Sequence, residues 1–357
     1  MTSEEQASVD SEGSQRDFYR LGAEEQARRY TLLARKALGA WGLGDASLSP
    51  IKLRENAVFA VERADGSRSV LRVHRAGYHS DQALQSELQW MQALDEFGVH
   101  TPAAIVSASG AAFERVAVPE VPEPRQVDLM TWVSGQAIGS IEQGVGDVAA
   151  AVRNYQLVGR LVARMHGFAR QWQPPPGFTR HAWDEEGLLG DQPLWGRFWE
   201  LAALDADQRR KLQAAREKAR TELAAYGKGV DRYGLIHADP LPENFLVEAD
   251  GTVRVIDFDD GGYGWLLFDF ATAMFVHLAE DRFDTLLQAL VAGYREEREL
   301  PPEFDARLPL FLLLRGFTYL GWAHTRSETE TARLIAPLLV GGVMSLVEDY
   351  LQGATED

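Results

Sequence analysis

The residues with the clearest chemistry lie between positions 235 and 260. This segment opens with Leu-Ile-His-Ala-Asp-Pro-Leu-Pro-Glu-Asn at 235–244 and closes with Val-Ile-Asp-Phe-Asp-Asp at 255–260. Because Pro240 and Pro242 restrict the backbone and cannot donate hydrogen bonds, the first part is predicted to be a rigid loop rather than a helix. The segment therefore combines a fixed loop with several carboxylates.

A β-hairpin is predicted to follow this loop. Apolar residues fill positions 245–247 and 253–256, and the Asp250-Gly251 pair between them is a strong turn signal. The simplest antiparallel register pairs Val247 with Val253. In that register the beginning of the first strand lies beside the end of the second.

Three oxygen-bearing side chains are expected at this open end of the hairpin. Asn244 precedes the first strand and Asp257 follows the second, and paired antiparallel positions are roughly 5 Å apart. Asp239 lies on the rigid loop just before them. Carboxylate and amide oxygens are ligands suited to Mg²⁺, and phosphoryl transfer needs metal ions on the phosphate oxygens and a carboxylate that orients the attacking hydroxyl. A lone His-x-Asp is usually a turn or a cap, but the combined pattern indicates phosphoryl transfer.

This pattern resembles the aminoglycoside phosphotransferase and choline kinase-like superfamily, whose members are related to the protein kinases. The motifs that carry the resemblance are H-A-D-P-L-P-E-N, V-I-D-F-D-D and, at 71–78, L-R-V-H-R-A-G-Y. The last motif resembles the branch of homoserine kinase-like, antibiotic and stress-response kinases. The resemblance covers about residues 25–350. It implies an α+β, two-lobed protein-kinase-like fold, with a small β-rich N-terminal lobe and a larger, mostly helical C-terminal lobe, and it implies ATP and Mg²⁺ as cofactors.

The resemblance also implies roles for residues of the C-terminal lobe. Asp239 corresponds to the catalytic base, and Asn244 and Asp257 correspond to the magnesium ligands. His237 is expected to brace the catalytic loop. Asp269 resembles the buried aspartate that anchors this loop from the following helix, although an acid at a helix start is also an ordinary feature.

An ion pair is expected in the N-terminal lobe. Ser80 can cap a helix on whose apolar stripe Glu87 lies, and a charge in that position needs a partner. Arg72 occupies the place of the phosphate-binding lysine of kinases. Arg72 and Glu87 are therefore expected to pair and to contact the nucleotide phosphates, with an arginine fork in place of a lysine point charge.

The remaining nucleotide contacts are implied by position. No glycine-rich loop precedes the first hairpin, and Leu-Arg-Glu-Asn-Ala-Val stands at 53–58 instead. Asn56 is expected to cover the phosphates there. Residues 129–133 resemble the hinge that offers backbone groups to adenine, with Met130 and Trp132 as contacts.

Hydrophobic periodicity and turn signals predict the organisation of the whole chain. We expect a flexible tail over 1–17, a nucleotide-binding lobe over 18–133 and a catalytic and substrate lobe over 134–352. The expected elements are a helix at 23–38, hairpin strands at 58–61 and 70–73 around Asp65-Gly66, short strands within 104–133 broken by prolines 119, 122 and 124, and helices at 148–165 and 207–226.

Composition excludes several classes of protein. The chain has 357 residues, no cysteine and a formal net charge of −17. Disulfides, thiolate nucleophiles and cysteine zinc sites are therefore excluded, and so acidic a chain is poorly suited to nucleic acid. No signal-peptide pattern opens the sequence and no apolar stretch approaches the length of a membrane span, so we expect a cytoplasmic protein with a small-molecule partner, and neither a nucleic acid nor a membrane as partner.

The acceptor is expected to be a small hydroxyl compound. We further hypothesise that this compound carries an amine. Residues 172–199 are rich in tryptophan and acids, and Trp183 with Asp184 could cage an ammonium group, with Asp259 assigned to the same site. The same composition also suits packing of an irregular insertion. The alternatives are a serine/threonine protein kinase of the stress-response type, a nucleotide-binding pseudokinase with a regulatory role and a metal-dependent phosphohydrolase.

Overall fold

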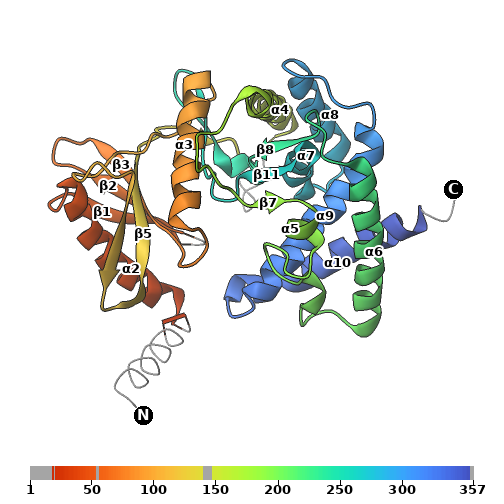
Figure 1. The fold of residues 1–357 in the computed structure, drawn as a ribbon, viewed down its shortest axis with the longest axis horizontal. Helices are drawn as coiled ribbons and strands as arrows, with labels where there is room; N and C mark the ends of the chain where they lie inside the picture. The colour runs from red at the N-terminus through yellow and green to blue at the C-terminus, as the bar shows by residue number, and fades with distance from the viewer. Residues whose placement is uncertain (1–17, 20, 54–55, 140–146, 354–357) are drawn as a thin grey trace, which may run out of the picture. The chain divides into compact units, whose positions relative to one another are not determined.

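The computed structural model describes residues 18–19, 21–53, 56–139 and 147–353. The tail expected at 1–17 lies outside these residues. The described chain divides into two compact units. The first extends to Asp95 and also contains Thr101–Ser134 and Pro175–Thr179, and the second contains Glu96–His100, Gly135–Pro174 and the chain from Arg180 onward. The first is built around a β-sheet and the second around helices (Figure 1), which confirms the expected α+β class.

The first unit contains an antiparallel five-stranded sheet in the order β1-β2-β3-β5-β4. The predicted hairpin is formed by β2 and β3, and Gly66 adopts the left-handed conformation that its turn requires (φ +80°). Two long helices and one 3₁₀ turn complete the unit. The bounds are α2 Ala23–Ala37, η1 Leu38–Trp41, β1 Ser47–Leu53, β2 Ala57–Glu62, β3 Arg68–Val73, α3 Asp81–Phe97, β4 Phe113–Val118 and β5 Val121–Thr131.

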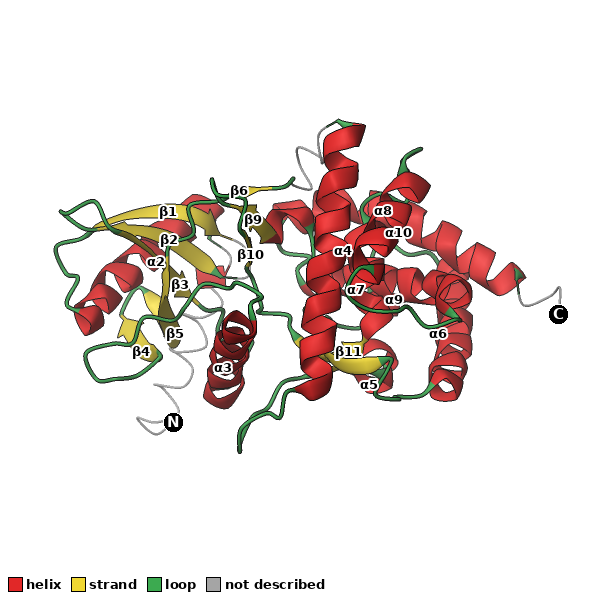
Figure 2. Ribbon diagram, turned by 90° about the horizontal axis from the view of Figure 1, so that it is seen from above, coloured by secondary structure: helices red, strands yellow, loops and turns green. Residues whose placement is uncertain are grey.

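The two faces of this sheet have different chemistry. Side chains alternate along a strand, and one face of β3 and β5 presents Leu71, Val73 and Leu129 to a core shared with α2. The opposite face presents Arg72 and Asp128, which are directly paired across the two strands. Figure 2 shows α2 and α3 beside the sheet. The buried pair Arg72 and Asp128 thus lies on the face that α2 does not cover.

The proline cluster does not break β5 into short strands, contrary to the expectation for residues 104–133. Pro122 and Pro124 lie within β5, which is continuous to Thr131. Pairing of β5 with β3 begins only at Val127, so the stretch before it has β4 as its one paired neighbour. A proline without an N–H is tolerated in such an edge segment.

The second unit is mostly helical and includes two small sheets, β10-β9-β6 and β7-β11-β8. Asp147 caps α4, accepting a hydrogen bond from the Ala150 N–H, and Asp205 forms a capping box at the start of α6. The strands are β6 Gln136–Ala137, β7 Ala182–Trp183, β8 Tyr233–Ile236, β9 Phe245–Val247, β10 Val253–Val255 and β11 Gly262–Trp265. The helices are α4 Val148–Gln171, α5 Glu185–Leu189, η2 Phe198–Glu200, α6 Ala206–Tyr226, η3 Pro242–Asn244, α7 Leu266–Phe275, α8 Phe283–Arg295, α9 Phe304–Thr325 and α10 Glu330–Gln352.

The last helix differs from one sequence expectation. By length and composition α10 is apolar enough to cross a membrane, although no such stretch was expected. It packs against α9 and α6 within the second unit. Its most apolar window is 28% buried, and a single helix of this kind is weak evidence for a membrane span.

Candidate active site

The predicted hairpin is present with the predicted register. In β9 and β10, Val247 pairs with Val253 and Phe245 with Val255. One step further, the Ile256 N–H donates to the Asn244 carbonyl at 2.9 Å. Asn244 and Asp257 therefore emerge at the same end of the hairpin, as expected from the sequence.

Asp239 is held by the side chain of Asn244. The Asn244 Nδ2 atom donates to the Asp239 carbonyl at 2.8 Å and to its carboxylate Oδ2 at 3.0 Å. Because both bonds use the amide nitrogen, the network assigns the amide oxygen to the other side. Asn244 is buried, whereas Asp257 is exposed.

This donor set fits a magnesium ion. The Asn244 amide oxygen and the Asp257 carboxylate are hard oxygen ligands, and Mg²⁺ in phosphoryl-transfer sites takes few protein ligands together with phosphate oxygens and water. The exposed position of Asp257 leaves room for such shared coordination. The residues therefore suit the ion implied by the resemblance.

Asp269 anchors the loop that carries Asp239. It lies fully buried in the first turn of α7. Its carboxylate accepts hydrogen bonds from the His237 N–H at 3.1 Å and the Ala238 N–H at 2.7 Å, and it contacts His166 Nε2 at 2.9 Å. The implied role of Asp269, loop anchoring rather than simple helix capping, agrees with these contacts.

Two non-glycine residues of the described chain have positive φ angles, Ala238 at +64° and Asp257 at +66°. One adjoins Asp239 and the other is the proposed metal ligand. Such conformations cost of order 1–3 kcal/mol and persist where surrounding contacts impose them. At Ala238 these contacts are the bond to Asp269 and a 3.3 Å bond from the Thr272 hydroxyl to the Ala238 carbonyl.

His237 braces the loop through both ring nitrogens. Nε2 lies 3.0 Å from the Ile256 carbonyl, and Nδ1 accepts the Asp239 N–H at 3.3 Å. These bonds fit a neutral ring with the proton on Nε2. The ring also packs against Phe258, with 4.7 Å between centroids. His237 thus connects the catalytic loop to the strand that leads to Asp257.

A buried arginine, which the sequence reasoning did not select, completes the surroundings of Asp239. Arg315 Nη2 donates to Asp239 Oδ1 at 2.9 Å, and its side chain is 1% exposed. A possible signal was its position in the apolar run of α9 (Leu-Leu-Leu-Arg-Gly-Phe, 312–317), because a charge inside such a run needs a partner.

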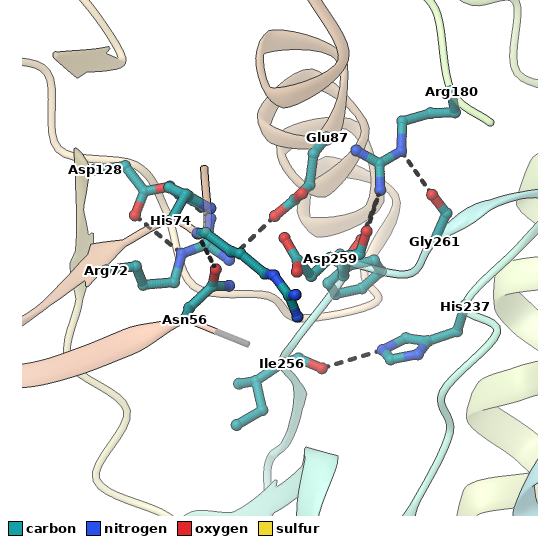
Figure 3. Close-up of polar contacts among 12 residues, drawn as sticks. Asn56, Arg72, His74, Glu87, Asp128, Arg180, His237, Ile256, Asp259 and Gly261 are labelled. Atoms are coloured by element: carbon teal, nitrogen blue, oxygen red, sulfur yellow. Dashed lines mark hydrogen bonds and ion pairs between the residues drawn. The ribbon is translucent and has the colours of Figure 1, made fainter. Parts of the chain in front are cut away.

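In the first unit, the expected pair of Arg72 and Glu87 is present. Arg72 Nη1 donates to Glu87 Oε1 at 3.0 Å (Figure 3). Arg72 also makes a two-pronged contact with Asp128, from Nε at 2.9 Å and from Nη2 at 2.5 Å. His74 Nε2 lies 3.0 Å from the same carboxylate. Asp128 and His74 were not predicted, although register places Asp128 directly opposite Arg72.

The charges in this cluster stabilise one another. Burial by itself would raise the pKa of Asp128, but the positive charge of Arg72 and the hydrogen bonds with Arg72 and His74 hold the pKa of this carboxyl well below its usual range. Asp128 therefore remains a carboxylate, and Arg72 is fixed between two acidic side chains.

Comparison with known proteins identifies the family of this chain. The sequence model of the Phosphotransferase enzyme family matches residues 47–306. The chain belongs to this family.

A solved structure of a microcompartment-associated aminopropanol kinase is 34% identical, covers 90% of this chain and 98% of its own, and has a TM-score of 0.80. Amicoumacin kinase from Bacillus subtilis is 26% identical over 78% of this chain and 80% of its own length. The amicoumacin kinase hAmiN, with 22% identity over 90% of this chain and 96% of its own, has the same fold with a TM-score of 0.70. The expected superfamily and kinase-like fold are confirmed, and the chain is a phosphotransferase enzyme.

The other nucleotide residues expected of this phosphotransferase lie on or near the sheet of the first unit. Met130 pairs with Val70 and shares a sheet face with Arg72 and Asp128. The guanidinium of Arg68 stacks on the Trp132 ring at 3.5 Å. The Asn56 amide oxygen accepts the Arg75 N–H at 3.2 Å, so it ties together the ends of β2 and β3.

The residues expected to cage an ammonium group have structural contacts. Trp183 is 1% exposed, stacks on Phe268 and donates its indole N–H to the Asp260 carbonyl at 2.8 Å. Asp184 caps α5 and pairs with Lys228 at 2.9 Å. These contacts correspond to packing and capping, the other interpretation of the segment, and none of them points to an acceptor.

The same segment holds the loop that follows Asp257. Arg180 is buried and donates to the carbonyls of Gly261 at 2.6 Å and Asp259 at 2.6 Å (Figure 3). Asp259 is itself buried, at 5% exposure. Residues 180–183 thus position the backbone next to the proposed metal ligand.

Proposed function

We propose that this protein transfers the γ-phosphoryl group of ATP, with Mg²⁺, to a hydroxyl of a small amine-bearing molecule such as an amino alcohol or an antibiotic. The observation that carries the proposal is the Asp239 carboxylate, which is fixed beside Asn244 and the exposed Asp257 on a loop anchored by Asp269. Membership of the phosphotransferase family supports it.

In the proposed reaction Asp239 accepts a hydrogen bond from the acceptor hydroxyl and orients its oxygen toward the γ-phosphorus. The hydroxyl proton passes to the carboxylate as the new oxygen–phosphorus bond forms, and the bond between the γ-phosphorus and the leaving nucleotide oxygen breaks. Asn244 and Asp257 would hold the metal, which when bound offsets the charge of the phosphate oxygens. The transfer is direct, without a covalent enzyme intermediate.

The first unit is proposed to bind the nucleotide. Arg72, fixed by Glu87 and Asp128, offers a rigid guanidinium to phosphate oxygens, a geometry that arginine matches well. Met130 and Trp132 are proposed to border adenine, and Asn56 to border the phosphates. The structural relative hAmiN was solved with AMP-PNP, which supports the use of ATP.

Charge and relatives support an amine on the acceptor. Aminopropanol kinase is named for an amino alcohol. The negative charges of Asp239 and Asp260 act on Arg315, and that of Glu243 acts on Tyr319. The net charge of −17 also favours approach of cations. A cytoplasmic location is also proposed, on the basis of membership of the phosphotransferase family.

The proposed base is tested with Asp239→Asn, which keeps the shape of the side chain and removes its charge. We expect kcat to fall by at least about 10²-fold, while calorimetric binding of ATP is retained. Asp191→Asn, at a 94% exposed carboxylate, is the control and should leave kcat unchanged. A kcat of Asp239→Asn close to that of the parent protein would refute the assignment.

The acceptor class is tested with aminopropanol and amine-free propanediol, which differ in one group. An amine-binding site requires a higher kcat/KM for aminopropanol, with part of the advantage lost at high salt. Equal rates would refute the amine preference and leave the alcohol kinase intact. Phosphorylation of peptides alone would indicate a protein kinase, and ATP binding without any transfer would indicate a pseudokinase.

A further inference from the structure

Arg315 is a charged residue in an apolar environment. The middle of α9 is buried nearly all round, and Leu313, Leu314 and Arg315 are at most about 1% exposed. A buried charge costs several kcal/mol unless it is paired and hydrogen-bonded. Replacing a whole buried ion pair with apolar residues is often neutral for stability, so packing alone does not explain an arginine paired with Asp239 here.

The contacts of Arg315 converge on the catalytic loop. Nη2 bonds to Asp239 Oδ1 at 2.9 Å and Nη1 to the Ala238 carbonyl at 3.3 Å. Asn244 holds the other carboxylate oxygen, Oδ2, at 3.0 Å. The carboxylate plane is therefore fixed from two sides, by α9 through one oxygen and by η3 through the other.

Aromatic rings hold the guanidinium in this position. It lies 4.4 Å from the ring centroid of Tyr319, 5.0 Å from Trp195 and 5.7 Å from Phe268. The Tyr319 hydroxyl accepts a further bond from Nη2 at 3.1 Å. Both hydrogens of Nη2 are thus directed, one to Asp239 and one to Tyr319, so the fork has little freedom to rotate.

We propose that Arg315 is the positioning residue for phosphoryl transfer, fixing the carboxylate of Asp239 in the orientation that receives the acceptor hydroxyl. The expected effect of Arg315 on kcat rests on the proposed function. The geometric part of the inference concerns only this chain. A displacement of about 1 Å in a reacting group can cost about 10²-fold in rate, so loss of Arg315 acts on kcat and not on nucleotide binding.

The test compares Arg315→Met with Arg315→Lys. Methionine fills similar space without charge, and lysine keeps a positive charge without the fork. We expect Arg315→Met to lower kcat by about 10²-fold with the calorimetric Kd of ATP unchanged. Arg315→Lys should recover part of this loss, because one donor can still reach Asp239.

Arg216→Met is the matched control for loss of a buried arginine. Arg216 is 8% exposed, lies 4.2 Å from the Trp199 ring and bonds to the Leu189 carbonyl at 2.7 Å and to Asp191 at 3.1 Å. It has the same kind of surroundings as Arg315 without Asp239. Its substitution should affect stability and leave kcat unchanged.

Crystal structures of the parent and Arg315→Met proteins separate this inference from the proposed function. Positioning by Arg315 requires the Asp239 carboxylate to turn away or become disordered in the variant. An unmoved carboxylate, or equal kcat values in the methionine variant and the parent, would overturn the inference. A displaced carboxylate in the variant, together with a parent protein that phosphorylates no acceptor, would uphold the geometric part of the inference and refute the proposed function.

Discussion

The sheet of the first unit offers a direct measurement of what burial does to an arginine–aspartate pair. Arg72 and Asp128 form a two-pronged contact, at 2.9 and 2.5 Å, with side-chain exposures of 10% and 0%. Arg115 and Asp81 form the same contact, at 2.9 and 2.7 Å, with exposures of 53% and 49%. The two pairs share this geometry and differ in access to water. Their further partners also differ, since Asp128 contacts His74 at 3.0 Å and Asp81 accepts a bond from Gln126 at 2.7 Å.

The expected effects of Asp128→Asn and Asp81→Asn follow from this difference. Removing one charge of a buried pair costs about 3–5 kcal/mol, because the other charge is left buried without compensation. Arg72 keeps Glu87 at 3.0 Å, so we expect the lower end, about 3 kcal/mol of unfolding free energy. Removing one charge of an exposed pair costs about 0–1 kcal/mol.

Native-state hydrogen exchange of the β3 and β5 amides measures these free energies within the first unit.

The pKa of Asp128 is lower in the folded state than in the unfolded chain. Its stabilisation is therefore fully present above about pH 4, the unfolded pKa, and is lost as the pH falls toward the folded value. Arg72 and Glu87 are the charged groups in this cluster, and the His74 ring also contacts Asp128. Asp128→Asn should lack this acid-dependent loss. Equal costs for the two substitutions at pH 7 would refute the reasoning from burial.

The remaining predictions concern the nucleotide. Asp257→Ala should abolish the dependence of ATP affinity on magnesium, as measured by calorimetry; an affinity in the parent protein that is indifferent to magnesium would contradict the assigned ligand. Arg72→Ala and Glu87→Ala should each weaken ATP binding, and the double variant should lose less than the sum of the two, because the side chains are in contact; strict additivity would show that they act independently.

The parts of the site that could be predicted from sequence are local ones. The register of β9 and β10 follows from a two-strand pattern around Asp250-Gly251, and it brings Asn244 beside Ile256 within a dozen residues of chain. The anchor Asp269 was accessible only because the motif resembles a known family. Turn residues and motif spacing are sufficient to predict such local positions.

The missed residues depend on contacts between distant positions. Arg315 is 76 positions from Asp239, and Asp128 is 56 positions from Arg72. No turn or period in the sequence connects these pairs. The expectation for Trp183 was ambiguous for a different reason. Tryptophan and acidic residues suit both an ammonium cage and a packed core, and the sequence does not show that Trp183 is only 1% exposed.

The long-range contacts share one physical feature, which is the burial of charge around side chains that are proposed to act in catalysis and nucleotide binding. Arg72 is held by Glu87 and Asp128, and Asp239 is held by Arg315 and Asn244. A flexible charged side chain would lose rotamer entropy each time it bound a phosphate or a hydroxyl. Here that ordering takes place during folding, at the cost of desolvating the charges. Rigid placement of both groups before the ligands arrive is the arrangement that favours phosphoryl transfer, where catalysis is mainly positioning and electrostatic stabilisation.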